Sequence, residues 1–186
     1  MTWTGNGFRE DTTPTTDEKT AVGSLLLARR GAGAKIACLL GEESVCRTFS
    51  KLHVSDQSET HAIRLLRSVE SGHTNVGQID QLADRLGIDV PPVRMDSQAK
   101  YAVLAAGAGE AYFRLLSSKQ PNYKEKIWDH AAGALILAEA GGKITDLDGK
   151  PLDFSHGRTL QANRGICATN GLVHDAVLHA LRDVGC

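Results

Sequence analysis

Hydrophobic and polar positions along the chain follow two different periods. Short apolar runs predict strands over residues 93–95, 111–116, 143–145 and 165–168. Apolar residues at helical spacing predict helices over 78–86, 97–106, 128–140 and 174–181. Because strands and helices alternate, we expect an α/β layer structure in which helices pack on a largely parallel or mixed sheet.

Turn-forming residues mark the ends of these segments. Gly87 is placed to end the helix over 78–86, and the Gly141-Gly142 pair ends the helix over 128–140. Asp148-Gly149 predicts a turn. Residues 61–69 fit a strand and a helix equally well.

The first part of the chain follows another pattern. Residues 1–20 are polar and rich in threonine without any period, so we predict a disordered start, with a start held only by contacts to other parts of the chain as the alternative. Two short apolar segments around the glycines of 31–33 predict a β-hairpin over 22–40. We therefore expect three parts: a disordered start over 1–20, the hairpin region over 21–50, and an α/β domain over 51–186.

Composition narrows the class of protein. The 186 residues carry 21 Lys and Arg against 22 Asp and Glu, which argues against a nucleic-acid partner. The most apolar window, 21–28, is far shorter than the roughly 20 residues of a membrane span, so no membrane role is expected. The four cysteines are scattered without a zinc-like spacing, which predicts free thiols and a cytoplasmic protein.

One acidic residue stands out as a metal ligand. Asp129, in the segment Trp-Asp-His-Ala-Ala-Gly, is predicted in the first turn of a helix, where a carboxylate can bind a hard cation. Small residues behind it allow a close approach of the helix backbone. An aspartate at this position can equally serve only as the helix N-cap.

Several other residues are candidates for binding an anion. Ser97 and Lys100 are predicted on one face at the start of a helix, where a hydroxyl, an ammonium and backbone N–H groups can meet a phosphate. Arg114 lies between apolar residues of a strand, and His73 lies in a polar loop beside a glycine. The alternatives are an exposed Lys100 behind a serine cap, an Arg114 that points to solvent, and a surface His73.

Several segments, in their order and spacing, resemble one family. They are Met-Asp-Ser-Gln-Ala-Lys-Tyr at 95–101, Glu-Lys-Ile-Trp-Asp-His-Ala-Ala-Gly at 125–133, Glu-Ala-Gly-Gly at 139–142, Pro-Leu-Asp-Phe at 151–154 and Gly-Arg-Thr-Leu at 157–160. Together they resemble the carboxyl-terminal half of 3'(2'),5'-bisphosphate nucleotidases, which belong to the inositol monophosphatase superfamily.

The resemblance implies a fold, a substrate and a cofactor. The implied fold is the carboxyl-terminal half of a layered α-β-α-β-α sandwich, with a mixed sheet flanked by helices and preceded by a hairpin. The implied reaction is Mg²⁺-dependent hydrolysis of the 3'-phosphate of adenosine 3',5'-bisphosphate to AMP and phosphate. Asp129 matches the shared metal ligand and also contacts substrate, and the residues that match the nucleotide-binding positions are His73, Ser97, Lys100 and Arg114.

The sequence departs from the family in its metal ligands. The family's Asp-Pro-Ile/Leu-Asp-Gly-Thr segment is missing, and Glu42-Glu43 lies after the hairpin that should follow such ligands. One carboxylate cannot hold two Mg²⁺ ions, so we expect little phosphatase activity from a chain that lacks the amino-terminal half. The alternatives are a non-catalytic nucleotide-binding or interaction module and an inositol phosphate phosphatase-like protein. The exposed hairpin edge predicts a dimer.

Overall fold

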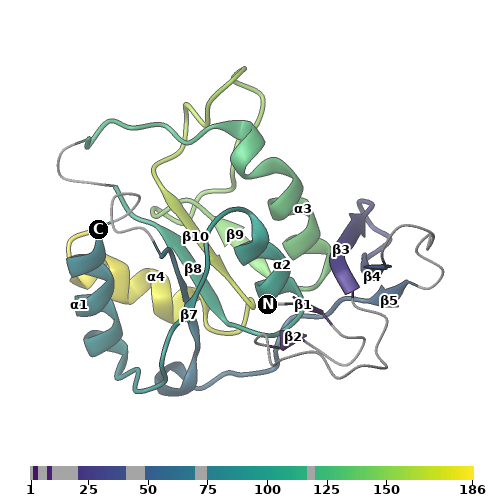
Figure 1. Cartoon of the computed structure of the whole chain (residues 1–186). Coiled ribbons are helices and arrows are strands. Elements are labelled where there is room, and N and C mark those ends of the chain that lie inside the picture. Colours follow the sequence, from purple (N-terminus) through teal and green to yellow (C-terminus); the bar gives the residue numbers. More distant parts are fainter. Residues whose placement is uncertain (1, 4–7, 10–20, 41–48, 70–74, 117–119) are drawn as a thin grey trace.

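The computed structural model describes residues 2–3, 8–9, 21–40, 49–69, 75–116 and 120–186 (Figure 1). His73, Glu42 and Glu43 lie outside these residues. The strands are β1 Thr2–Trp3, β2 Phe8–Arg9, β3 Ala21–Ala28, β4 Ala34–Leu40, β5 Ser50–Lys51, β6 Leu65–Arg67, β7 Val93–Arg94, β8 Ala111–Arg114, β9 Lys143–Thr145 and β10 Ile166–Thr169. The helices are α1 Val76–Leu86, α2 Ala99–Ala105, α3 Ala131–Glu139 and α4 His174–Asp183, with 3₁₀ turns η1 Thr60–Ala62 and η3 Ile127–Asp129.

The main sheet is mixed, as the sequence predicted. Its strand order is β7-β6-β8-β10-β9. The pairs β6–β7 and β6–β8 are parallel, whereas β8–β10 and β10–β9 are antiparallel. Strand β8 therefore sits in the middle of the sheet, where its side chains meet helices on both faces.

Helices cover both faces of this sheet (Figure 1). Side chains alternate across a strand, so Tyr112 of β8 packs in one core cluster and its neighbour Phe113 packs in the other. The first cluster contains residues of α2 and α3, including Leu104 and Leu137. The second contains residues of α1 and α4, including Leu82. Hydrophobic burial on both faces thus fixes the α/β layers.

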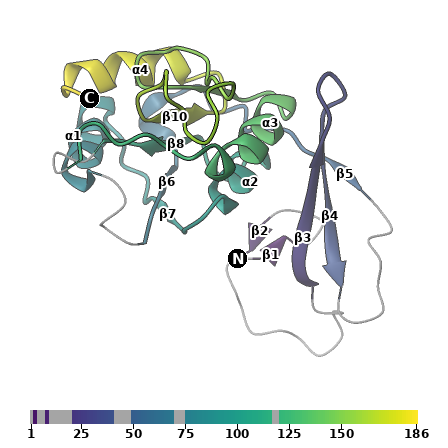
Figure 2. The same ribbon diagram turned by 90° about the horizontal axis from the view of Figure 1, so that it is seen from above.

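The predicted hairpin is confirmed as β3 and β4, which β5 extends into a three-stranded sheet. Its turn is tied to α3, since both oxygens of the Glu139 carboxylate accept hydrogen bonds, one from the N–H of Gly31 and one from that of Gly33, each 2.8 Å long. Both glycines have a positive φ, which suits glycine in a tight turn. Figure 2 shows the hairpin beside the main sheet, on the side of α3.

The two faces of the hairpin differ. Ala34 and Ile36 are buried in the first core cluster, whereas Leu25 and Leu27 remain 47% and 57% exposed. Strand β3 forms the edge of its sheet. Within 1–20, strands β1 and β2 pair with each other, and the other residues of that range are not described. The predicted disorder, the three-part division and the dimer stay predictions.

Several element boundaries differ from those expected, most of them by one or two residues. The ambiguous segment 61–69 contains the end of η1 and the strand β6. Helix α2 begins two residues after Ser97, whose φ of 64° lies in the left-handed region. The predicted helix over 128–140 is wrong at its start, because η3 precedes α3 and His130 joins them with a φ of −132°. The helix over 78–86 is confirmed, with Gly87 in the left-handed conformation at its end.

No helix in the described part of the chain is long and apolar enough to cross a membrane.

Cys167 and Cys186 are free thiols, as expected. The Asp148-Gly149 turn is also confirmed. Buried Asp146 holds this turn by accepting hydrogen bonds from the N–H groups of Asp148 and Lys150, at 3.0 and 2.8 Å.

A fully buried histidine lies between the sheet and α4. The two ring nitrogens of His174 each lie 3.0 Å from a threonine hydroxyl, one on Thr145 and one on Thr169. The pKa of His174 is lowered to about 4, mainly by burial and in addition by the nearby charge of Lys143, while Asp175 opposes the shift. The neutral ring is therefore the form that fits this core.

We predict a loss of stability on acidification that depends on His174. Between pH 6.5 and 4 the unfolded chain binds this proton and the folded chain does not, so the free energy of unfolding falls as the pH falls, by at most about 1.4 kcal/mol per pH unit. Urea unfolding at several pH values measures this slope. His174→Gln should flatten the curve, and His156→Gln, at a half-exposed position, should not. Equal slopes for wild type and His174→Gln would contradict the prediction.

Candidate functional site

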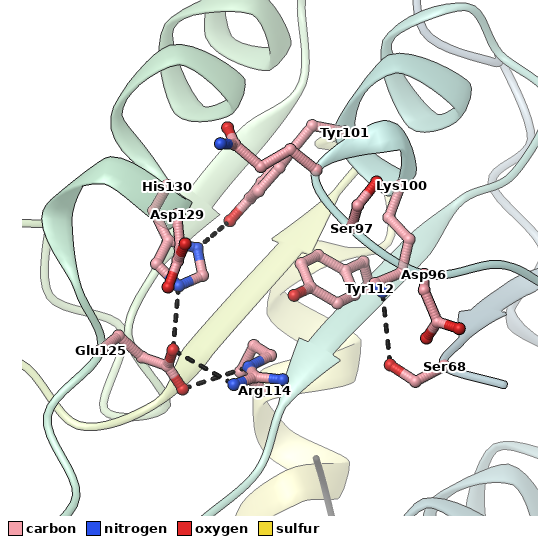
Figure 3. A pocket seen from close by; sticks show the side chains of 11 residues that line it. Ser68, Asp96, Ser97, Lys100, Tyr101, Tyr112, Arg114, Glu125, Asp129 and His130 are labelled. Atoms are coloured by element: carbon pink, nitrogen blue, oxygen red, sulfur yellow. Dashed lines mark hydrogen bonds and ion pairs between the residues drawn. The ribbon is translucent and has the colours of Figure 1, made fainter. Parts of the chain in front are cut away.

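A cavity of about 360 Å³ opens at one end of β8, between α2 and the segment that leads into α3 (Figure 3). This volume is within the usual range for small-molecule sites. Four of the five predicted site residues line it together. The lining residues are Ser68, Asp96, Ser97, Gln98, Lys100, Tyr101, Tyr112, Arg114, Glu125, Asp129 and His130.

Strand β8 supplies the cavity with Tyr112 and Arg114. The two residues are separated by one position, so the pleat directs both side chains to the same face of the sheet. Arg114 does not point to bulk solvent. Its Nε and one terminal nitrogen donate hydrogen bonds of 3.2 and 3.4 Å to the two oxygens of Glu125. The anion that Arg114 was predicted to need is thus supplied, at least in part, by the protein itself.

Glu125 is the buried end of a chain of hydrogen bonds. The Tyr101 hydroxyl lies 2.8 Å from Nδ1 of His130, and Nε2 of His130 lies 3.1 Å from the Glu125 carboxylate. Because an ionised carboxylate only accepts hydrogen bonds, Nε2 donates to Glu125; in the neutral imidazole Nδ1 then accepts from the Tyr101 hydroxyl. All three side chains are buried.

The charges of this chain are balanced. Burial raises the pKa of Glu125, but the hydrogen bond from His130 and the charge of Arg114 outweigh it, so the net shift is downward. Burial opposes the charge of Arg114, and Glu125 outweighs that cost, so the pKa of the guanidinium rises. Both groups are charged at neutral pH, and each holds the other in place.

A glycine lets α3 approach this chain closely. Gly133 lies in the first turn of α3, against the ring of Tyr101 in α2, and a Cβ atom there would overlap the ring. The small residues after Asp129 therefore serve helix packing, as the sequence analysis allowed. The close approach brings His130 within reach of Tyr101.

Lys100 and Ser97 lie on the opposite side of the cavity from Glu125 (Figure 3). Lys100 is only 3% exposed, and its ammonium donates to the Ser68 hydroxyl at 3.3 Å and to the Met95 carbonyl at 3.2 Å. Burial lowers the pKa of Lys100, while Asp96 opposes and Arg114 reinforces this shift. The alternative of an exposed Lys100 is wrong. Ser97 accepts a hydrogen bond of 3.2 Å from the N–H of Ala99 ahead of α2.

Asp129 is an exposed residue at the end of η3 and at the rim of the cavity. Its side chain forms no hydrogen bond to the described residues, and the N-cap of α3 is His130 instead. Two other carboxylates line the cavity: Glu125, which Arg114 and His130 already occupy, and Asp96, which accepts a hydrogen bond from the N–H of Val69. Among the described residues no group of three or more His, Cys, Asp or Glu could hold a metal ion. These residues alone therefore do not fit a magnesium site.

Sequence reasoning missed four residues that define the cavity. Tyr101, Glu125 and His130 lie inside the quoted motifs, but nothing in their spacing shows that they bond to one another. Tyr112 is an aromatic residue in a predicted strand, a pattern typical of core packing. The place of His130 just before three small residues was the available signal for that histidine, whereas Glu125 lies between Lys124 and Lys126 and has no such signal.

Comparison with known proteins gives a consistent family. Residues 19–185 match the Inositol monophosphatase family. The 3'(2'),5'-bisphosphate nucleotidase of Emericella nidulans is 44% identical over 87% of this chain and 45% of its own length. That of Oryza sativa is 40% identical over 87% of this chain and 43% of its own length. The chain thus spans less than half the length of these curated relatives.

Solved structures agree on the fold. The extragenic suppressor protein SuhB of Bartonella henselae aligns with a TM-score of 0.61 at 21% identity, covering 88% of this chain and 54% of that one. SuhB of Mycobacterium tuberculosis aligns with a TM-score of 0.59 at 22% identity, covering 87% and 55%. The predicted layered fold with a mixed sheet is therefore confirmed.

We predict that Glu125→Gln is costly to the fold. The amide keeps the shape of the side chain but leaves the guanidinium of Arg114 partly buried without its counter-charge. We expect the free energy of unfolding to fall by about 2–4 kcal/mol in urea unfolding experiments. The matched control is Asp183→Asn, which breaks an ion pair with Arg85 whose side chains are 32% and 56% exposed, and it should change stability by less than about 1 kcal/mol. A similarly small loss in both variants would contradict this assignment.

Proposed function

Since the chain belongs to the inositol monophosphatase family, we propose that it provides the nucleotide-binding part of a 3'(2'),5'-bisphosphate nucleotidase, which hydrolyses the 3'-phosphate of adenosine 3',5'-bisphosphate to AMP and phosphate. Support for this substrate comes from the relatives at 40–44% identity, which carry that name. Support from the structure comes from the cavity, which gathers Ser97, Lys100, Arg114 and Asp129.

Unused hydrogen-bond donors carry the proposal. An ammonium has three N–H groups, and Lys100 uses two of them on Ser68 and Met95. A guanidinium has five, and Arg114 uses two of them on Glu125. Two buried or half-buried cations therefore retain donors on a shared cavity. Phosphate oxygens are the acceptors that such donors bind most strongly.

The role of these residues is to bind and orient the substrate. Lys100 and Arg114 would hold phosphate oxygens, and Ser97 offers a hydroxyl at the same rim. Magnesium, the cofactor implied by the family resemblance, would polarise the scissile phosphate. Because the described residues do not fit its binding site, we assign Asp129 only as one candidate ligand and His73 only as a further candidate contact to the nucleotide.

A non-catalytic nucleotide-binding module is the second candidate function. The observation in its favour is the lack of a metal-binding cluster among residues that the structure describes. Such a module would keep Lys100 and Arg114 for binding and would release no phosphate.

Calorimetric titration of the folded chain with adenosine 3',5'-bisphosphate, with and without Mg²⁺, tests the proposal together with an assay of phosphate release. We expect binding without Mg²⁺, weakened about tenfold or more by Lys100→Ala, because a charge-assisted hydrogen bond is lost. Lys150→Ala, at an exposed position, is the matched control and should bind as the wild type does.

The outcomes separate the two candidate functions. Phosphate release that needs Mg²⁺ and is abolished by Asp129→Ala supports the nucleotidase. Binding without release supports the module. A folded wild-type chain that does not bind the nucleotide contradicts both.

A further inference from the structure

Tyr112 lines the cavity, and its side chain is more than nine-tenths buried. Its hydroxyl has no hydrogen-bond partner among the described residues. It is 6% exposed. Figure 3 shows its ring between the Asp129 side and the Lys100 side of the cavity, with the hydroxyl free of any drawn hydrogen bond. No buried side-chain oxygen of the described residues lacks a hydrogen-bond partner, so the Tyr112 hydroxyl is open to the cavity, where it can donate to a bound molecule.

The ring of Tyr112 is held in place from two sides. It meets the ring of Tyr101 edge to face, with centroids 5.3 Å apart and planes at 86°. The ammonium of Lys100 lies 5.2 Å from the centre of the Tyr112 ring, at cation–π distance. The backbone is held between β6 and β10, where Tyr112 pairs with Leu66 and Ala168. A hydroxyl on such a ring loses little entropy when it binds a ligand.

The two tyrosines that touch have different roles. Tyr101 donates its hydroxyl hydrogen to His130 and so belongs to the chain that holds Glu125 and Arg114. Tyr112 has no such commitment within the described structure. Burial raises the pKa of the Tyr112 phenol, so the group keeps its proton and remains a donor at neutral pH.

Three donors therefore face the same cavity. Lys100 and Arg114 retain N–H groups, and Tyr112, two residues before Arg114 on β8, adds an O–H. Glu125 already balances the charge of Arg114, whereas Lys100 bonds only to a neutral hydroxyl and a carbonyl, so an anionic oxygen would supply the counter-charge that Lys100 lacks in the cavity and accept from all three donors.

We propose that the Tyr112 hydroxyl donates a hydrogen bond to a phosphate oxygen of the bound ligand, between Lys100 and Arg114, and so helps to select phosphorylated ligands. This inference deepens the proposed function and rests on it only for the identity of the nucleotide. The class of ligand group, an oxyanion such as phosphate, follows from the donors.

Tyr112→Phe tests the inference because it removes only the hydroxyl and keeps the ring packing. Titrations of the full chain would use inorganic phosphate, adenosine 3',5'-bisphosphate and adenosine. We expect about tenfold weaker binding of both phosphate-bearing probes, and no change for adenosine. Tyr123→Phe is the matched control, since that tyrosine does not line the cavity and should leave all three affinities unchanged.

A measurement on the wild type covers the case in which Tyr112→Phe does not fold. In a chain labelled with ¹³C at tyrosine Cζ, phosphate should shift the resonance of a single tyrosine beyond those of the other two. A titration in which phosphate binds and no tyrosine resonance moves would overturn the inference.

The results distinguish this inference from the proposed function. Phosphate binding that depends on Tyr112, without nucleotide binding, keeps the inference and overturns the nucleotide proposal. Tight nucleotide binding that Tyr112→Phe leaves unchanged does the reverse. A folded chain that binds neither phosphate nor nucleotide overturns both.

Discussion

The ion pair between Arg114 and Glu125 is the interaction on which the candidate site depends. Arg114 comes from the middle of the main sheet, and Glu125 comes from the segment that leads into α3, so the pair joins two layers of the fold. Removing one charge leaves the other partly buried and uncompensated. The hydrogen bonds through His130 to Tyr101 fix the carboxylate from behind. A rigid guanidinium with spare donors is the result.

The alternation of strands and helices was sufficient to predict the layers, because burial on two faces of a sheet imposes a simple period on the sequence. The helix that ends at Gly87 and the hairpin over 22–40 followed from turn chemistry that acts over a few residues. The start of α3 could not be predicted in this way. His130 there has a φ of −132° and bonds to Tyr101 and Glu125, which lie 29 and 5 positions away in the sequence. Contacts between such distant residues produce no periodic pattern in the sequence.

The candidate site, like the fold, could be predicted only in part from the sequence. Ser97, Lys100, Arg114 and Asp129 could be selected from the sequence by their predicted places at a helix start or in a strand and by the motifs that contain or flank them, and the structure brings them to one cavity. The residues that hold these side chains in place, such as Glu125, could not be selected from the sequence. Glu125 can reach Arg114 because α3 packs closely against α2. This close packing depends on the lack of a side chain at Gly133. A glycine carries that information only once its neighbour Tyr101 is known.

Helix α3 has a different partner at each end. Its first residues follow Asp129 and His130 at the cavity, and its last residue, Glu139, grips the turn of the hairpin through two backbone N–H groups. Nine residues of helix span about 14 Å. A single short helix therefore links the hairpin, whose outer face bears Leu25 and Leu27, to the rim of the cavity.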